Sequence, residues 1–347
     1  MINALEAATR AIDTHLNGRA RARIGRADVD KHGRLVLQVG DDRWFRYDGE
    51  LVELDPHRDR RVPLARMARA AGTIVSYRPE RRIVVRCDSP QGSGCTYAKG
   101  LRAGRGAQAA ERHRAGARAA RSAGFEAPEL IDVDAGSSVL RLSELAGMPL
   151  RITDPGTFER LGQRLREFQE QDSTSELDVF DPPEVRRELE RWASKVRTAT
   201  GTLPTGWEAA HALWLDSVAP ERSPRVLAHR DLHDGQFVQT SAGLGLLDFD
   251  GLARADPALD LANLDAHLYL RGLQRWLGAT SESALRASSA LLAGHGCQAE
   301  ADFTQRLHFY RTATFLRLAL LYALRPRWSE LVPDLVRLAS PALRRTS

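Results

Sequence analysis

The first part of the chain combines two patterns of apolar residues. Over residues 2–17, apolar side chains recur at helical spacing with charged residues between them, which predicts an amphipathic helix. Short runs of strand-forming residues follow, separated by turn-forming Gly and Asp pairs; they cover residues 34–39, 43–47 and 50–54. The Asp48-Gly49 pair is a strong hairpin signal. We therefore expect residues 1–70 to form a small α+β appendage.

A second strand-rich region begins near residue 72. In chain order, the predicted elements are strands at 73–77, 82–86 and 96–101, a helix at 104–122, and strands at 130–133 and 138–142. The helix is rich in Ala, Arg and Glu, which favour helical backbone. The order of elements predicts a domain over residues 71–145 that contains a β-sheet and one helix.

Beyond Pro149 the apolar residues recur mainly with a helical period. Asp154 is a suitable N-cap for the first of these helices. Further helices are expected at 183–198, 205–218, 257–277, 282–294, 301–325 and 329–339. One strand-rich stretch interrupts them, at 225–250. The whole pattern predicts an α+β protein whose last domain, residues 146–347, is mainly helical.

Composition narrows the class of protein. The 347 residues are 43% hydrophobic and 27% charged, which is typical of a globular protein. The net charge of +5 is spread along the chain without a dense basic block, so nucleic-acid binding is not favoured. The three cysteines lack zinc-site spacing, and no apolar run approaches the ~20 residues of a membrane span. With no signal peptide evident, we expect a cytoplasmic protein without membrane or nucleic-acid partners; its oligomeric state stays open.

The strand-rich stretch 225–250 contains the residues best suited to chemistry. Transfer of a γ-phosphoryl group requires a carboxylate that accepts the proton of the attacking hydroxyl, oxygen ligands for Mg²⁺, and a fixed cation for the phosphates. Asp231, in a turn flanked by apolar strand residues, suits the first task. Asp248 ends an apolar Leu-Leu strand, and Gln236 offers an amide oxygen. Carboxylate and amide oxygens are ligands of hard cations.

Lys99 is the candidate for the fixed cation. It lies on the third strand of the second region and is one of only three lysines in an arginine-rich chain. Lysine is a compact point charge, whereas arginine is not, so its use here favours a specific role over a solvated surface cation. Glu111, on the following helix, is a candidate partner for Lys99. Its neighbours Arg112 and Arg114 are equally good surface partners, so both interpretations stay open.

These residues resemble the aminoglycoside phosphotransferase family, which is related to choline kinases and, more distantly, to protein kinases. The resemblance covers about residues 72 to 270. Besides Lys99 and Glu111, the motifs that carry it are His229-x-Asp231 with an amide at 236, Asp248-Phe249-Asp250, Asp256-Pro257-Ala258-Leu259-Asp260-Leu261-Ala262 and the hinge-like Glu144-Leu145-Ala146-Gly147-Met148-Pro149-Leu150. It implies a two-lobed, protein-kinase-like fold with a small β-rich N-lobe, a mainly helical C-lobe and, here, the extra N-terminal α+β appendage.

The resemblance also implies roles for individual residues. Asp231 would be the catalytic aspartate and Lys99 the phosphate-binding lysine, with Glu111 as its partner. The resemblance implies ATP and Mg²⁺ as cofactors, with Asp248 and Gln236 as the metal ligands. Backbone groups near Glu144 and Ala146 would receive the adenine ring.

The chain departs from the family pattern at three places. The family usually has Asn where this chain has Gln236, whose side chain is one methylene longer. The turn Arg78-Pro79-Glu80-Arg81 contains no glycine, so it is not a glycine-rich phosphate cover. Arg230 matches the His-Arg-Asp of protein kinases, but Asp256 follows Asp248 too closely to leave room for an activation segment.

The leading hypothesis is an ATP- and Mg²⁺-dependent O-phosphotransferase that acts on a hydroxyl of a small molecule. An aminoglycoside or other antibiotic, a sugar and a metabolite all remain open as acceptors. The alternative from another class is a nucleotide-binding pseudokinase that works as a scaffold through residues 1–70. A protein kinase is disfavoured, because the segment that would be regulated is missing.

Overall fold

The computed structural model describes residues 2–16, 18, 24–40, 43–65, 68, 72–88, 94–134, 136, 138–172, 176–217, 225–297 and 301–340. The chain divides into two compact units, each made of separate segments. Unit 1 contains Met1–Asp55, Pro182–Ala219 and Arg311–Ser347, and unit 2 contains Pro56–Asp181 and Pro220–Tyr310. Every candidate site residue named above belongs to unit 2.

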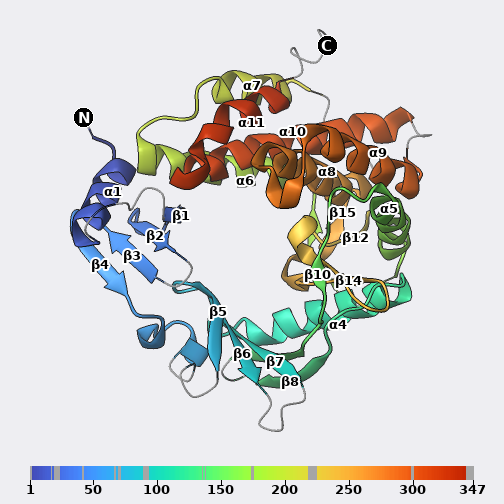
Figure 1. Ribbon diagram of the computed structural model, residues 1–347, viewed down its shortest axis with the longest axis horizontal. Helices are drawn as coiled ribbons and strands as arrows, with labels where there is room; N and C mark the ends of the chain where they lie inside the picture. Colours follow the sequence, from blue (N-terminus) through green and yellow to red (C-terminus); the bar gives the residue numbers. More distant parts are fainter. Residues whose placement is uncertain are drawn as a thin grey trace. The chain divides into compact units, whose positions relative to one another are not determined.

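Unit 2 contains a five-stranded antiparallel sheet in the order β5-β6-β7-β9-β8. Its strands are β5 (Thr73–Arg78), β6 (Arg82–Asp88), β7 (Cys95–Leu101), β8 (Leu130–Asp134) and β9 (Val139–Ser143). Helix α4 (Gly106–Ser122) packs along β8 and β9, where the small side chain of Ala110 lies in a core cluster with Leu140. Figure 1 shows α4 running along the sheet. The predicted order of three strands, a helix and two strands is confirmed, with boundaries that differ by one or two residues.

The rest of unit 2 is mainly helical. Its long helices are α5 (Pro155–Gln169), α8 (Pro257–Gln274) and α9 (Ser281–His295), and the first part of α10 (Ala301–Ala323) also belongs to it. Glycine allows α5 and α9 to approach closely, because a Cβ atom on Gly294 would lie 2.0 Å from the Glu159 carbonyl oxygen. The C-terminal end of α8 comes three residues before its predicted limit, since Arg275 adopts left-handed backbone with φ 51°.

Two small sheets surround the strand-rich stretch of unit 2. One joins β10 (Met148–Pro149), β13 (Phe237–Gln239) and β14 (Leu244–Leu246); the other joins β11 (Val179–Phe180), β15 (Ala253–Ala255) and β12 (Val226–Ala228). The 3-10 turns η2 (Asp234–Gln236) and η3 (Phe249–Gly251) also lie in this part, and a further one, η4 (Trp276–Gly278), follows α8. The segment from β12 to η3 therefore crosses both small sheets, which fixes its ends.

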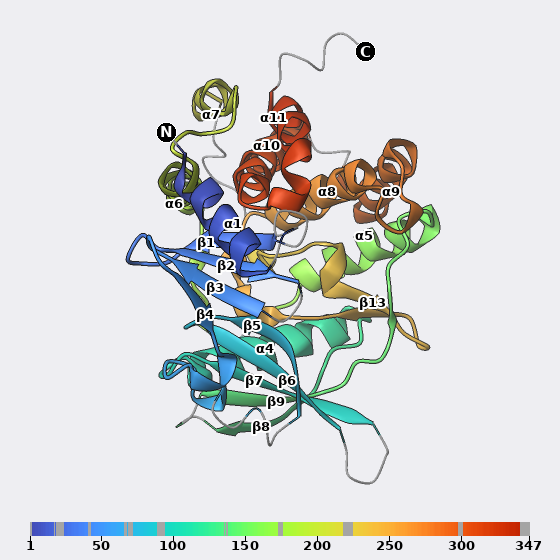
Figure 2. The ribbon, with the colours of Figure 1, turned by 60° about the vertical axis from the view of Figure 1, so that its left-hand side comes forward.

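Unit 1 joins the two ends of the chain. Helix α1 (Ala4–His15) packs on a four-stranded antiparallel sheet, β1 (Ile24–Val29), β2 (Leu35–Val39), β3 (Arg43–Tyr47) and β4 (Leu51–Leu54) (Figure 2). Its other helices are α6 (Pro182–Thr200), α7 (Trp207–Leu215), the last part of α10 and α11 (Val332–Ala339), which follows the 3-10 turn η6 (Pro326–Leu331). The Ala27 N–H donates to the Leu324 carbonyl oxygen at 2.7 Å, so the first strand is bonded to the end of α10.

The sequence did not predict strand β1. Its residues include Gly25, Ala27 and Asp28, which are depleted in strands. The strand forms because β2 pairs with it along its length and α6 packs against it. Among the described residues, none of the helices combines the length and the apolar composition that crossing a membrane requires.

Candidate functional site

The loop that carries Asp231 is held in shape by a buried carboxylate. It follows β12 directly, and Asp260 of α8 accepts hydrogen bonds from the His229 N–H at 2.6 Å and the Arg230 N–H at 2.7 Å. Arg230 has φ 71°, a left-handed conformation that costs a non-glycine residue free energy. Burial raises the pKa of Asp260, against the opposing effect of these donors and His229. The two hydrogen bonds stabilise the strained turn and leave Asp231 exposed at its end.

A second set of bonds ties this loop to the strand that leads to Asp248. His229 Nε2 lies 2.8 Å from the Leu247 carbonyl oxygen, and because a carbonyl only accepts, the proton is on Nε2. The Leu247 N–H in turn donates to the Gln236 carbonyl oxygen at 2.9 Å. Leu247 thus fixes both ends of the loop 229–236, one residue before Asp248.

Asp248 and Asp250 face two basic side chains from the five-stranded sheet. Lys99 Nζ lies 2.7 Å from Asp248 Oδ1 and 2.7 Å from Asp250 Oδ1. Arg82 Nη1 is farther away, at 3.3 Å from Asp248 Oδ2 and 3.5 Å from Asp250 Oδ2. The Lys99 side chain is only 9% exposed, whereas that of Asp248 is 25% exposed. A carboxylate that keeps an accessible edge beside a buried ammonium is suited to bind a further cation.

The electrostatics of Asp248 follow from these partners. Burial pushes the pKa of the Asp248 carboxyl upward, but the charges of Lys99 and Arg82 outweigh it and hold this pKa well below its usual range. Asp248 also has φ 61°, again a left-handed conformation. The residue is therefore a fixed anion at neutral pH, on backbone that is strained to aim it.

Glu111 forms no ion pair with Lys99. Its side chain is 63% exposed and pairs with Arg114 on the same helix, which favours the alternative of an ordinary surface partner. The face of α4 next to the Asp248–Asp250 segment carries other residues. Arg112 Nη1 donates to the Asp250 carbonyl oxygen at 3.1 Å, and the His113 ring meets the Phe249 ring edge-on with centroids 5.6 Å apart.

Gln236 is buried, and its amide faces His233 rather than Asp248. Its Nε2 atom is placed 3.2 Å from His233 Nε2. The Gly235 N–H donates to His233 Nδ1 at 3.0 Å, and burial lowers the pKa of His233 despite Asp231 and Asp234, so the neutral ring carries its proton on Nε2. That N–H needs an acceptor, which the Gln236 amide provides when its oxygen is turned toward the ring.

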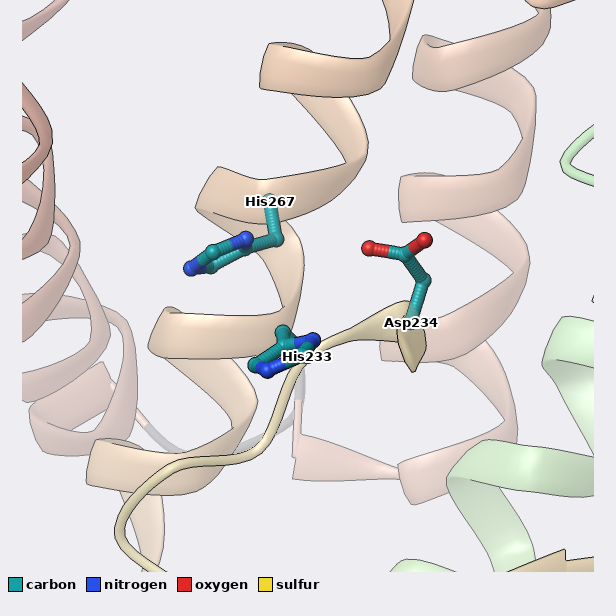
Figure 3. A group of neighbouring side chains, drawn as sticks. All are labelled: His233, Asp234 and His267. Carbon is teal, nitrogen blue, oxygen red and sulfur yellow. The ribbon is translucent and has the colours of Figure 1, made fainter. Parts of the chain in front are cut away.

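His233 also belongs to a group with Asp234 and His267 whose ligand atoms all lie within 4.8 Å of one another (Figure 3). The two imidazole rings stack with centroids 5.1 Å apart. Both carboxylate oxygens of Asp234 accept from Arg271 Nε at 2.9 Å and the Asp234 side chain is only 9% exposed, so it keeps no accessible oxygen for a cation. The group is better suited to order the loop 229–236 against α8 than to attract a cation.

Glu144 and Ala146 lie in the segment that connects β9 to β10. Both residues are exposed. β9 pairs with β7, and Met148 of β10 pairs with Gln239 of β13, so the backbone between them is anchored at both ends. This connection leaves their peptide groups outside both sheets.

The structure thus brings some of the expected residues together and leaves others apart. Lys99 contacts Asp248 directly, and the loop of Asp231 and Gln236 is bonded to the residue before Asp248. Glu111 is not part of this group. Sequence reasoning missed Arg82, whose only signal was its place beside the turn between the first two strands of the sheet.

We compared the sequence and the structure with those of known proteins. Residues 81–292, more than half of the chain, match the phosphotransferase enzyme family, whereas no curated protein matches the sequence. Similar solved structures include a choline/ethanolamine kinase family protein from Mesorhizobium loti, with TM-score 0.55 and 19% identity, covering 82% of this chain and 93% of that one. Another is the amicoumacin kinase hAmiN in complex with AMP-PNP, Ca²⁺ and Ami, with TM-score 0.57, 12% identity and coverage of 78% and 90%.

A third is the aminoglycoside phosphotransferase APH(3'')-Id from Streptomyces rimosus, with TM-score 0.51, 23% identity and coverage of 75% and 96%. At these identities the likeness concerns the fold, and it confirms the predicted protein-kinase-like α+β architecture with a β-rich N-terminal part and a helical C-terminal part. The family match extends from the start of β6 into α9 and includes Lys99, the loop of Asp231 and the Asp248–Asp250 segment, so the chain belongs to the phosphotransferase enzyme family.

Proposed function

We propose that this phosphotransferase uses ATP and Mg²⁺ to phosphorylate a hydroxyl group of a small molecule. The observation that carries the proposal is the contact of Lys99 Nζ with Asp248 Oδ1 at 2.7 Å, beside a loop that presents the exposed carboxylate of Asp231. A fixed amine, an ionised carboxylate and an accessible carboxylate are the three groups that γ-phosphoryl transfer requires of a protein.

The donor atoms near Asp248 fit a hard divalent cation. Asp248 and Asp250 offer carboxylate oxygens, and Gln236 offers an amide oxygen once its hydrogen bond with His233 is exchanged. Lys99 and Arg82 already contact these two carboxylates, so a metal ion would share or replace those contacts. When bound, Mg²⁺–ATP supplies the phosphoryl group and a cation that neutralises the charge developing on it.

Each residue then has a defined task. Asp231 orients the acceptor hydroxyl and takes its proton as the hydroxyl oxygen bonds to the γ-phosphorus and the bond to the β–γ bridging oxygen breaks, which releases ADP. Lys99 fixes the α/β-phosphates as a point charge. Backbone groups of Glu144 and Ala146 hold the adenine ring. Asp260 keeps the loop of Asp231 rigid through its two backbone hydrogen bonds.

The acceptor is a small hydroxylated compound. Solved structures of the same fold are named for the phosphorylation of aminoglycosides, amicoumacin, choline or ethanolamine. Antibiotics, sugars and amino alcohols with free hydroxyls therefore form the set in which to search. The short connection from Asp248 to Asp256 supports a small-molecule acceptor over a protein one, because no regulatory segment lies between them.

A coupled assay of ADP release tests the proposal across that set of acceptors. We expect at least one hydroxylated compound to raise ADP release well above the rate with ATP alone. Asp231→Asn should reduce this rate about 10³-fold, since it removes the proton acceptor, while nucleotide affinity stays near that of the wild type. The matched control is Asp172→Asn, a carboxylate of the same unit whose side chain is 96% exposed. Normal turnover by Asp231→Asn, or wild-type protein that binds nucleotide but phosphorylates nothing, would contradict the assignment.

A further inference from the structure

Two arginines flank the turn between β5 and β6, and their side chains project from the same face of the sheet. Arg78 and Arg82 are directly opposite each other in the strand register, so their side chains lie on one face. Val84 is two residues after Arg82 and is paired with Lys99 on β7, which puts Lys99 on that face as well. Three basic side chains of the sheet are thus directed to the side where Lys99 and Arg82 meet the Asp248–Asp250 segment.

The backbone of this turn has no free donor for a ligand. Pro79 lacks an N–H, the Glu80 N–H donates to Asp59 Oδ2 at 2.6 Å, and the Arg81 N–H donates to the Arg78 carbonyl oxygen at 3.0 Å. The Tyr77 hydroxyl also donates to Asp59, at 2.9 Å. A glycine-rich turn contacts phosphates through its backbone, whereas here any such contact has to come from side chains held by a braced turn.

Both guanidinium groups have unused hydrogen-bonding capacity. The Arg82 side chain is 21% exposed, its contacts with Asp248 and Asp250 are at the outer limit of hydrogen bonding, and its buried Nε has no partner. Arg78 is half-buried, and its guanidinium forms no ion pair with any described residue. Burial and the nearby charge of Arg82 lower the pKa of Arg78, while Asp231 and Asp248 oppose them. Two adjacent guanidinium groups with spare donors favour an anion with several oxygens between them.

We propose that Arg78 and Arg82 form a guanidinium clamp for the nucleotide phosphates, and that Arg82 occupies the cation position beside Asp248 and Asp250 until a divalent metal replaces it. This inference rests on the proposed function and names the residues that bind its phosphate donor. Lys99 keeps its two short contacts in either state. Arg82, with longer contacts, is the cation that exchanges, and the phosphates that arrive with the metal receive its released N–H groups.

The exchange predicts that loss of Arg82 changes the affinities for nucleotide and for metal ion in opposite directions. Without Arg82, the nucleotide loses charged hydrogen bonds, whereas the metal alone loses a competitor for the same carboxylates. We expect Arg82→Gln to weaken the affinity for Mg²⁺–ATP about 10- to 100-fold. The same variant should bind Mn²⁺ alone at least about threefold more tightly, because one positive charge next to the site is gone. Arg78→Gln should weaken nucleotide binding and change Mn²⁺ binding less.

The experiment combines calorimetric titration of Mg²⁺–ATP with titration of Mn²⁺ alone followed by electron paramagnetic resonance, on the full-length chain. Arg86→Gln is the matched control, because Arg86 lies on the same strand with its side chain exposed and pairs with Asp88. Circular dichroism verifies folding of each variant. If Arg82→Gln does not fold, Arg82→Lys replaces it. A lysine keeps the charge but lacks the planar fork, so its affinity for Mg²⁺–ATP should be weaker than that of the wild type and of Arg86→Gln, by less than about tenfold.

The outcomes separate the clamp from the function on which it rests. Weaker nucleotide binding together with tighter Mn²⁺ binding supports the clamp. Wild-type affinity for Mg²⁺–ATP in Arg82→Gln, or a parallel loss of nucleotide and Mn²⁺ affinity, overturns it, while turnover of the wild type leaves the proposed function standing. If the wild type binds no nucleotide, or if Asp248→Asn binds Mn²⁺ as the wild type does, the proposed function fails and the clamp fails with it.

Discussion

The two units of the chain each contain a short lysine–aspartate pair. The N–O distances are nearly equal, but the groups around the two pairs differ. In unit 1, Lys195 Nζ on α6 lies 2.6 Å from Asp28 Oδ1 on β1. In unit 2, Lys99 Nζ lies 2.7 Å from Asp248 Oδ1. The ammonium of Lys195 also lies 4.7 Å from the centroid of the Trp192 ring, and Asp28 accepts a hydrogen bond from the Val29 N–H. Both groups of the unit 1 pair are thus satisfied locally.

The unit 2 pair is surrounded by features that the other lacks. Asp250 also contacts Lys99, and Arg82 also contacts Asp248. Asp248 adopts left-handed backbone with φ 61°. Strain and unmatched hydrogen-bonding capacity of this kind gather at functional sites, since stability alone does not favour them. A short Lys–Asp contact therefore indicates function only together with its surroundings.

The largest expected effect is that of Lys99→Met on turnover. Removing the amine that fixes the phosphates should lower kcat/KM for ATP about 10³-fold, as loss of a preorganised charge in a partly buried site does. Steady-state kinetics with the acceptor found in the screen would measure it. Lys195→Met is the matched control, and its folded fraction should turn over at the wild-type rate. Near-normal kcat/KM in Lys99→Met would remove the distinction between the two pairs.

Lys195→Met should instead act on stability. It removes the ammonium that lies 2.6 Å from the Asp28 carboxylate, whose side chain is only 14% exposed, and we expect the free energy of unfolding to fall by about 3 kcal/mol. Urea denaturation would measure the change. The double variant Lys195→Met/Asp28→Asn should recover part of the loss, because the largely buried carboxylate charge that the lysine paired with is gone. If the single variant is as stable as the wild type, the unit 1 pair is not a structural one.

The smallest expected effect is a pH dependence of stability that does not involve the Lys99–Asp248 pair. Burial lowers the pKa of His295 to about 4, so the folded protein keeps this ring neutral where the unfolded chain would protonate it near 6.5. Its contribution to stability is fully present above pH 6.5 and is lost as the pH falls toward about 4, amounting to about 2 to 3 kcal/mol. The pKa of Asp248 is lower still, so the Lys99 pair stays ionised over that range.

Denaturation curves at several pH values test this, with His295→Gln as the comparison. Glutamine can still contact Gln169, which lies 3.0 Å from His295 Nε2 in the wild type, but it binds no proton in this range. The variant should therefore show a flatter dependence of unfolding free energy on pH. An equally steep loss in the variant would assign the acid sensitivity to another group.

The sequence predicted the parts of the site that depend on local order along the chain. Asp231 and Asp248 lie in short motifs whose spacing encodes a turn and a strand end, and Lys99 was conspicuous in an arginine-rich chain. The five-stranded sheet followed from periods of two and its turns. Such patterns do not determine how one element is rotated against another. On α4, one residue step turns the side chain by about 100°, which is why Arg112 and not Glu111 meets the Asp248–Asp250 segment.

Two other features were hidden for related reasons. Strand β1 has a weak local preference and forms through pairing with β2 and packing against α6. Arg82 was one arginine among many, and only the register that puts it opposite Arg78 and on the face of Lys99 distinguishes it. Both depend on contacts between segments rather than on the residues themselves.

One measurement tests most directly whether Asp248, the aspartate beside Lys99, binds a metal ion together with the nucleotide. It is the calorimetric affinity for ATP with and without Mg²⁺, compared between wild type and Asp248→Asn. We expect Mg²⁺ to tighten ATP binding to the wild type at least about tenfold and to have little effect on the variant, whose affinity for metal-free ATP should be unchanged or higher because a nearby negative charge is gone. An Asp248→Asn protein that responds to Mg²⁺ as the wild type does would contradict this role.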